Sequence, residues 1–370
     1  METSEVFFTD MHCTSSLNLL KKLERLVKAA GFEKMDFNRK MTAIKIHFGE
    51  PGNLAYLRPN FAAKVASMVR ERGGKPYLTD CNTLYSGERN NAPDHLNAAF
   101  SNGYNPLSAG CHVVIADGIK GTDYREIEVN LDYTRKAMIG TAISDADIII
   151  SMSHFKGHEQ TGFGGALKNL GMGCASVGGK LFLHSGNPPF IYQKNCTGCK
   201  ICVNNCAHDA VHLGDDRKAY IDYDRCTGCG QCVAVCQFDA ARVQGNSESD
   251  ALNRKIAEYA YAVVRDKPAL HVNFIMDVSP DCDCWGHNDR PLVEDIGIAA
   301  STDPVALDKA SVDMVMNAPA ARHLREKENG NDLRGEDKFR LVHGSTDWKT
   351  GLLHGEKIKL GSLSYKLIKI

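Results

Sequence analysis

A repeated cysteine pattern constrains this chain more than any other feature of its sequence. The segment N-C-T-G-C-K-I-C-V-N-N-C-A-H-D-A (195–210) recurs thirty residues later as R-C-T-G-C-G-Q-C-V-A-V-C-Q-F-D-A (225–240), and each copy has the spacing C-x2-C-x2-C-x3-C. Eight of the 14 cysteines lie in one window of 41 residues. Such dense ligand-like spacing favours metal sites over disulfides, and with them a reducing compartment.

This spacing is typical of bacterial ferredoxins that hold two [4Fe–4S] clusters, in which the fourth cysteine of each run binds the other cluster. Gly198 and Gly228 allow each run to curl tightly. We expect one cluster to be bound by Cys196, Cys199, Cys202 and Cys236, and the other by Cys226, Cys229, Cys232 and Cys206. Ala207 and Gln237 replace the usual prolines, which bears on local geometry rather than on cluster binding. A zinc module or a set of free thiols is the alternative.

Composition excludes several classes of partner. The net charge of −1 and the pI near 6.9 give no electrostatic footprint for nucleic acid or anionic lipid. No apolar run approaches the ~18 residues of a membrane span. The first residues, M-E-T-S-E-V-F-F-T-D, are acidic and do not resemble a signal peptide. We therefore expect a cytoplasmic protein with no nucleic-acid or membrane partner.

Strands and helices are predicted to alternate along both flanks of the cysteine repeat. Apolar runs predict strands at 42–48, 76–79, 112–116, 147–152, 180–183 and 271–276, and helical spacing predicts helices at 17–30, 58–73, 249–266 and 304–317. Residues 341–370 are predicted to form terminal strands. The pattern indicates an α/β fold with a largely parallel sheet and helices on both faces. We expect a discontinuous α/β domain, 1–189 plus 246–370, with a ferredoxin domain inserted at 190–245.

Polar residues follow several of these strands. In open parallel sheets, ligands gather outside the carboxyl ends of the strands. We therefore expect one rim that binds a small-molecule substrate or cofactor, built in part from His47, Glu50, Asp80, Asn82, Arg89 and Asp117. The longest such segment is H-F-K-G-H-E-Q-T-G-F-G-G-A-L-K-N (154–169), directly after the strand at 147–152.

Three interpretations of the 154–169 loop compete: a phosphate cradle, a tight turn and a catalytic pocket. Gly162, Gly164 and Gly165 before a helix suit anion capture, yet the loop matches neither common glycine-rich nucleotide motif. A tight turn explains the glycines but leaves the basic residues unexplained. A histidine suits proton transfer near neutral pH, and a lysine can bind a carboxylate or form an imine. The predicted catalytic residues are His154, Lys156, His158 and Lys168, together with His184 after the strand at 180–183.

Two cysteines outside the repeat form a weaker motif, P-D-C-D-C-W-G-H (280–287). In an extended segment Cys282 and Cys284 would face the same side, with His287 within reach. A further metal site, a redox-active thiol pair and simple packing all remain open. Farther on, Asp303 and Pro304 have the pattern of a helix start.

Several segments together resemble the iron–sulfur members of the family known as domain of unknown function 362. They are K-I-H-F-G-E (45–50), T-D-C-N-T-L-Y-S-G-E-R (79–89), S-H-F-K-G-H-E-Q-T-G-F-G-G-A-L-K-N-L-G-M-G-C (153–174), the two cysteine runs, C-D-C (282–284) and D-I-G-I-A-A-S-T-D-P-V-A-L-D (295–308). The resemblance covers nearly the whole chain, but it implies no assigned activity.

A weaker resemblance links the 154–169 loop to nickel-dependent lactate racemases. His158, Lys168 and His184 keep that family's spacings of ten and sixteen residues. The resemblance implies Lys168 as the tether of a nickel-pincer cofactor, His184 as a metal ligand and His158 as the proton-transfer base.

The leading hypothesis is an iron–sulfur oxidoreductase. It would take electrons from a soluble donor protein, or return them to an acceptor, and exchange them with a small substrate or second cofactor at the rim. One alternative is a non-catalytic electron carrier or redox sensor, and another is a racemase-like enzyme with a lysine-tethered cofactor. The sequence identifies neither the substrate nor a second organic or metal cofactor.

Overall fold

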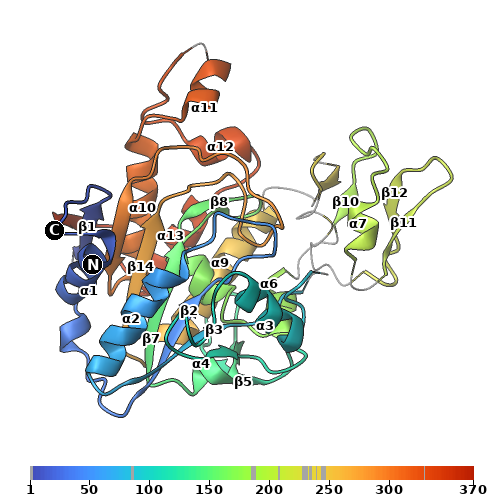
Figure 1. Cartoon of the computed structure of the whole chain (residues 1–370). Helices are drawn as coiled ribbons and strands as arrows, with labels where there is room; N and C mark the ends of the chain where they lie inside the picture. The colour runs from blue at the N-terminus through green and yellow to red at the C-terminus, as the bar shows by residue number, and fades with distance from the viewer. Residues whose placement is uncertain are drawn as a thin grey trace.

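A mixed eight-stranded sheet forms the centre of the computed structural model, which describes residues 3–84, 87–184, 189–206, 209–226, 232, 236–238, 240–242, 247–328 and 330–370 (Figure 1). In spatial order its strands are β16 (Tyr365–Lys369), β1 (Ser4–Asp10), β15 (Gly297–Ser301), β14 (Ala269–Ile275), β7 (Ile148–His154), β2 (Met41–Ile46), β3 (Lys75–Asp80) and β4 (Val113–Ile115). The run from β14 to β4 is parallel, β15 is antiparallel to both of its neighbours, and β16 is parallel to β1.

Both faces of this sheet are buried. All residues of β7 are buried, as expected for an apolar strand with parallel neighbours on each side. Ile148 and Ile150 belong to one hydrophobic core, and Ile149 belongs to the other. The predicted α/β fold with a mostly parallel sheet is therefore confirmed.

Helices cover the two faces. The helices α1 (Leu19–Ala29), α2 (Pro59–Glu71) and α3 (Ala92–Ser101) contribute to one core. The helices α5 (Ala166–Gly171) and α10 (Pro304–Asn317) contact the other face, and α9 (Ser247–Val264) packs on α5. The shorter helices are η1 (Phe32–Lys34), α4 (Thr141–Ser144), α6 (Val177–His184), α11 (Arg322–Lys327), α12 (Lys338–Val342) and α13 (Lys349–Lys357). Two hairpins complete the body: β5 (Tyr124–Glu128) with β6 (Lys136–Gly140), and β8 (Lys156–His158) with β9 (Gly162–Gly164).

Most predicted elements are present, and α10 has the predicted bounds. Its predicted cap is confirmed, because Asp303 Oδ1 accepts the N–H groups of Val305 and Ala306, each at 2.9 Å. The strand predicted at 180–183 was wrong, since these residues lie in α6, where Leu183 is buried in the core. The prediction of strands throughout 341–370 was also wrong: α13 and the end of α12 precede β16.

A cysteine-rich segment, residues 189–242, lies to one side of the α/β body (Figure 1). Its described parts are α7 (Ile201–Asn204) and two small antiparallel pairs, β10 (Phe190–Ile191) with β13 (Ala241–Arg242) and β11 (Val211–Leu213) with β12 (Ala219–Ile221). Val211, Ala219 and Ile221 belong to a small core of its own that also contains Cys202 and Cys232. Among the described residues of the whole chain, no helix has the length and apolar character needed to cross a bilayer.

Candidate functional site

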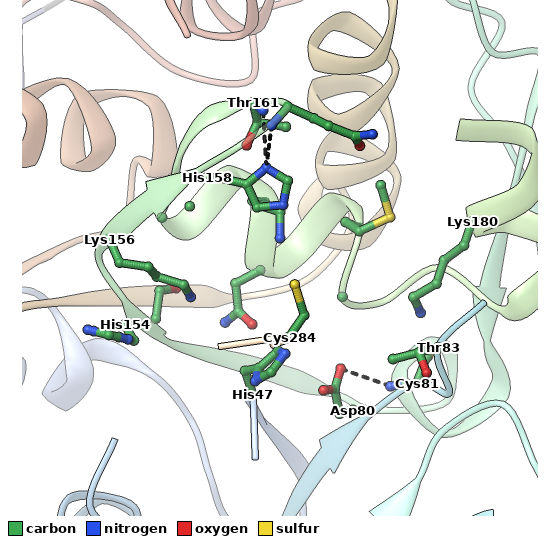
Figure 2. A pocket seen from close by; sticks show the side chains of 18 of the residues that line it. His47, Asp80, Cys81, Thr83, His154, Lys156, His158, Thr161, Lys180 and Cys284 are labelled. Carbon is green, nitrogen blue, oxygen red and sulfur yellow. Dashed lines mark hydrogen bonds between the residues drawn. The ribbon is translucent and has the colours of Figure 1, made fainter. Parts of the chain in front are cut away.

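A pocket lies beyond the carboxyl ends of β2, β3 and β7, bordered by the β8–β9 hairpin, α5 and α6 (Figure 2). Its cavity volume is about 110 Å³, several times the ~10–15 Å³ that one water molecule needs. A small organic molecule therefore has room to bind. The structure brings these residues singled out by sequence to its lining: His47, Asp80, Arg89, His154, Lys156, His158, Gly164, Gly165, Lys168, His184 and Cys284.

The β8–β9 hairpin owes its position to close packing of its glycines. A Cβ atom on Gly157 would lie 2.0 Å from the carbonyl oxygen of Pro280, and the Gly157 N–H donates to Ser279 O at 2.8 Å. Gly162 has a φ of +82° and lies against Trp348, away from the pocket lining. The tight-turn interpretation therefore accounts for these two glycines.

Asp308 occupies the start of α5, where the phosphate-cradle interpretation would place an anion. Its carboxylate accepts the N–H groups of Ala166 at 2.7 Å and Leu167 at 2.9 Å. Asn273 Nδ2 donates to the same group at 2.8 Å. Burial raises the pKa of Asp308 to about 6. The helix start is thus filled by a side chain of α10, and the geometry gives no support to a phosphate site there.

Asp283 anchors two basic residues of the loop. Its carboxylate lies 2.8 Å from His154 Nδ1 and 3.2 Å from Lys156 Nζ. His154 Nε2 faces the carbonyl oxygens of Met276 and Asp277 at 2.9 and 3.1 Å, so both ring nitrogens of His154 are engaged by acceptors. Burial alone would raise the pKa of Asp283, but His154 and Lys156 bring it below its ordinary value.

His158 has a defined hydrogen-bonding direction. Its Nδ1 accepts the backbone N–H groups of Gln160 and Thr161, each at 3.1 Å (Figure 2). A neutral imidazole has one acceptor nitrogen and one N–H, so the proton lies on Nε2. This nitrogen lies 3.8 Å from Glu159 Oε1, and the ring points toward Cys284. His158 therefore presents an N–H to the pocket.

The two thiols of the C-D-C motif meet Lys168. Its Nζ lies 3.4 Å from Cys282 Sγ. A hydrogen bond from Cys284 holds the pKa of Cys282 well below its usual range, with further contributions from Lys168, Lys156 and His158. The same hydrogen bond, together with burial, raises the pKa of Cys284. Burial alone would lower the pKa of Lys168, but the two sulfur atoms raise it above its ordinary value.

The pocket lining has more cationic than anionic side chains, but most of the cations are paired with anionic groups. The cationic side chains belong to Lys45, Arg89, Lys156, Lys168 and Lys180, whereas the carboxylates of the lining belong to Asp80 and Glu159. Lys45 Nζ lies 3.0 Å from Asp80 Oδ1, and Arg89 Nε lies 2.7 Å from Glu50 Oε2. Glu50 is behind the lining. Lys180 has no ion pair among the described residues, and its Nζ donates to Ala175 O at 2.6 Å, so it suits an anionic ligand group such as a carboxylate or phosphate.

Two further histidines of the lining are neutral at physiological pH. Burial lowers the pKa of His184 to about 3, assisted by the nearby charges of His158 and Lys168. Burial and the adjacent Arg89 hold the pKa of His47 well below its ordinary value. His184 is therefore available as a proton acceptor beside His158, whereas His47 Nε2 is 2.9 Å from Arg89 Nη1.

The remaining predicted rim residues support the lining from behind. Asn82 Nδ2 donates to Asp117 Oδ1 at 2.9 Å, and burial raises the pKa of Asp117. Glu50 holds Arg89, and Cys282 lies behind Cys284. His287, expected near the thiols, is exposed and lies beside Trp285 instead.

In the cysteine-rich segment, a second and smaller cavity is lined by Cys196, Cys199, Cys202 and Cys236, the four residues predicted to bind one cluster. The N–H of Ala219 donates to Cys196 Sγ at 3.3 Å, and that of Ala240 donates to Cys236 Sγ at 3.3 Å. Four convergent cysteines with N–H···S bonds match the donor set of a [4Fe–4S] cluster. Of the second predicted set, Cys206, Cys226 and Cys232 are described, and Cys229 lies outside the described residues.

Trp285 connects the two sites. It directly follows Cys284, and its side chain packs against the small core of the cysteine-rich segment. The loop that carries it is fixed to residues 50–54: Glu50 N–H donates to Asp283 O at 2.9 Å, and Asn53 Nδ2 donates to His287 O at 2.8 Å. One short loop therefore contacts both the pocket and the cysteine-rich segment.

Comparison with known proteins places the chain in a family. The profile described as "Domain of unknown function (DUF362)" matches residues 42–313. The chain belongs to the DUF362 family. The match includes both the pocket-forming strands β2, β3 and β7 and the cysteine-rich segment.

Individual relatives of this DUF362 protein are distant. Thylakoid-associated protein sll1697 of Synechocystis sp. is 30% identical over 131 residues, which are 35% of this chain and 36% of that protein. The lactate racemase apoprotein of Thermoanaerobacterium thermosaccharolyticum has a TM-score of 0.39 at 11% identity, over 73% of this chain and 51% of that one. A Thermotoga maritima protein has a TM-score of 0.38 at 11% identity, over 71% and 52%. The chain thus spans about half the length of these two structures and about a third of the first relative.

Several residues that shape the pocket carry no sequence signal of their own. Asp283 is hidden between two more conspicuous cysteines, and Asp308 is five positions beyond the helix cap that explains its neighbourhood. Lys45 is a charged residue in an otherwise apolar predicted strand, and this was the one signal in the sequence that it has a special role. In the structure it is buried and paired with Asp80.

Proposed function

We propose that this DUF362 protein is an iron–sulfur oxidoreductase that exchanges electrons between its cysteine-rich segment and a small anionic substrate or cofactor in the pocket. A soluble redox protein is the external donor or acceptor. Cys196, Cys199, Cys202 and Cys236 hold one [4Fe–4S] cluster, and Cys226, Cys229, Cys232 and Cys206 hold the other. Bound clusters supply one-electron transfer, with potentials that span roughly −700 to +450 mV among proteins.

The observation that carries this proposal is the position of Trp285. The cavity of four cysteines would also suit a free-standing electron carrier, and the pocket would also suit an enzyme without redox chemistry. Trp285 packs against the core that contains Cys202 and Cys232, while the preceding residue, Cys284, lines the pocket. A shared loop between the two sites favours a single function that uses both.

The pocket supplies what a reduction of an organic molecule needs besides electrons. Lys180, which has no ion pair among the described residues, suits an anionic group of the substrate. His158 offers an N–H, and neutral His184 in the same pocket lining offers a proton acceptor. Lys168 keeps a positive charge beside Cys282, which suits charge stabilisation rather than imine formation, since an imine requires a neutral amine.

Cluster reoxidation under anaerobic conditions tests the proposal. The reconstituted protein is photoreduced and mixed with a library of small carboxylates and phosphates that contain a reducible carbonyl, double bond or disulfide. We expect one class to reoxidise the clusters, followed by turnover with an artificial reductant.

Matched variants decide whether the pocket takes part in the reaction. His158→Gln and Lys168→Met should lower kcat/KM by about 10²–10⁴-fold, the range of a positioned acid–base or charged group, without loss of iron. His112→Gln and Lys327→Met, which change exposed residues, are the controls. Equal turnover in all four variants would remove the pocket from the reaction and favour an electron carrier.

A further inference from the structure

Cys282 and Cys284 lie together on a tight turn of the 280–288 loop. The N–H of Trp285 closes the turn by donating to Cys282 O at 3.1 Å. Both sulfur atoms and one ring nitrogen of His158 lie within 4.8 Å of one another. The two thiols are free, and Cys284 lines the pocket while Cys282 is buried behind it.

The direction of His158 argues against a metal ion between these three residues. An imidazole that binds a metal through Nε2 carries its proton on Nδ1 and donates it to an acceptor. Here Nδ1 faces two backbone N–H donors, from Gln160 and Thr161. Nε2 must therefore keep its proton, and His158 acts as a hydrogen-bond donor to Cys282 instead.

The other neighbours of the pair favour a thiolate. Lys168 Nζ is 3.4 Å from Cys282 Sγ, and Lys156, held by Asp283, is a second nearby cation. Two carboxylates are nearby. Asp283 is paired with Lys156, and Glu159 lies on the Cys284 side, close to His158 Nε2. One thiolate and one thiol next to fixed cations are the usual features of a reactive cysteine pair.

We propose that Cys282 and Cys284 form a redox-active dithiol–disulfide couple that stores two electrons at the wall of the pocket. In reduction, two electrons and one proton enter the pair: the S–S bond breaks, Cys284 sulfur takes the proton, and Cys282 remains a thiolate beside Lys168. In oxidation, Cys284 loses its proton, the S–S bond forms, and the two electrons leave to an oxidised ligand in the pocket.

The couple deepens the proposed function and rests on it for its source of electrons. One-electron donors such as iron–sulfur clusters deliver electrons singly, whereas most reductions of organic molecules need two. Cys284 directly precedes Trp285, which contacts the cysteine-rich segment, and Cys284 lines the pocket. The couple is therefore placed where single electrons can be collected into pairs.

A thiol–disulfide titration of the full-length, anaerobically purified protein tests the couple. The protein is equilibrated in buffers of reduced and oxidised glutathione, its thiols are alkylated, and the peptide around the pair is analysed by mass spectrometry. Residues 266–309 contain no other cysteine, so the readout is specific. We expect a reversible two-electron transition that Cys282→Ser abolishes and Cys111→Ser, a change of a buried thiol elsewhere in the core, preserves.

Lys168→Met supplies a second readout. If Lys168 stabilises the thiolate, its loss should shift the equilibrium at least about tenfold toward the disulfide, which lowers the midpoint by about 30 mV. Lys327→Met should leave the midpoint unchanged. If Lys168 had only a structural role, its replacement would change the free energy of unfolding but leave the midpoint potential of the cysteine pair unchanged.

Two outcomes would overturn the couple. One is a pair that alkylates as a dithiol in every buffer. The other is about one metal ion per chain, beyond cluster iron, that disappears in Cys284→Ser. The titration needs no clusters, so it remains decisive even if the protein binds no iron, an outcome that would refute only the proposed iron–sulfur function.

Discussion

Gly165, directly before α5, packs against the carboxylate of Asp308 on α10. A Cβ atom at position 165 would be 2.3 Å from Asp308 Oδ1, so no side chain fits there. Because α5 carries Lys168, this contact sets the position of a pocket lysine from a helix more than a hundred residues away in the sequence. The glycine is thus needed for packing rather than for nucleotide binding.

Gly165→Ala should therefore destabilise the protein by about 1–3 kcal/mol, the usual range for overpacking. Urea unfolding followed by circular dichroism measures the loss. Gly344→Ala is the control, because a Cβ atom at Gly344 would meet only an ordinary contact at 3.7 Å. Equal stability of the two variants would show that α5 can shift freely away from Asp308.

Asp308 should give the unfolding free energy a distinct pH dependence. Its pKa in the folded protein is raised to about 6 from the usual 3.8, so the folded state binds this proton more tightly than the unfolded state. The stabilisation of the folded state by this bound proton is fully present below about pH 4, and it is lost as the pH rises through 6. The advantage of the wild type over Asp308→Asn should therefore shrink between about pH 5 and about pH 7.5.

Urea unfolding of both proteins at the two pH values checks this prediction. Other carboxylates titrate equally in the two proteins and cancel in the difference. A pH-independent difference would mean that Asp308 has an ordinary pKa in the folded state.

Asp283→Asn should be strongly destabilising. It leaves His154 and Lys156 without the buried carboxylate that they share, and breaking a buried ion pair from one side costs about 3–5 kcal/mol. Asp289→Asn, at an exposed position directly after the 280–288 loop, should change the unfolding free energy by less than about 0.5 kcal/mol. Similar values for the two variants would contradict the anchoring role of Asp283.

The strands that position the site could be predicted because they are apolar runs ended by polar residues, as in D-I-I-I-S-M-S-H (147–154). The residues at their ends could be placed at one rim because carboxyl ends of parallel strands coincide. The cysteine spacing identified a candidate cluster set directly. These inferences depend only on local pattern.

What could not be predicted depends on contacts between distant segments. The strands β1 and β15 owe their place in the sheet to pairing with each other and with β16 and β14. The segment 180–183 is apolar enough for a strand but lies in α6 because its partners are α9 and β6. The roles of Asp283 and Asp308 follow from residues 129 and 142 positions away, which no sequence window contains.

Iron analysis should reveal the cluster assignment. Wild-type protein reconstituted anaerobically should bind about eight iron atoms per chain, as two [4Fe–4S] clusters require. Cys236→Ser should lower this to about four and disturb the cluster of the first cysteine run, because Cys236 lines the cavity with Cys196, Cys199 and Cys202. Cys111→Ser should retain the full content. Loss of all iron in Cys111→Ser, or a single zinc ion in the wild type, would refute the assignment.

Electron transfer through the Trp285 loop tests the central claim most directly. The photoreduced clusters are mixed with a pocket substrate, and their reoxidation is followed in a single turnover. Trp285→Ala should slow this step at least tenfold with unchanged iron content, and Trp285→Phe should largely restore it. Tyr124→Ala, which changes an exposed aromatic residue of β5 in the body, should have little effect. A rate that is the same in Trp285→Ala as in the wild type would contradict the account.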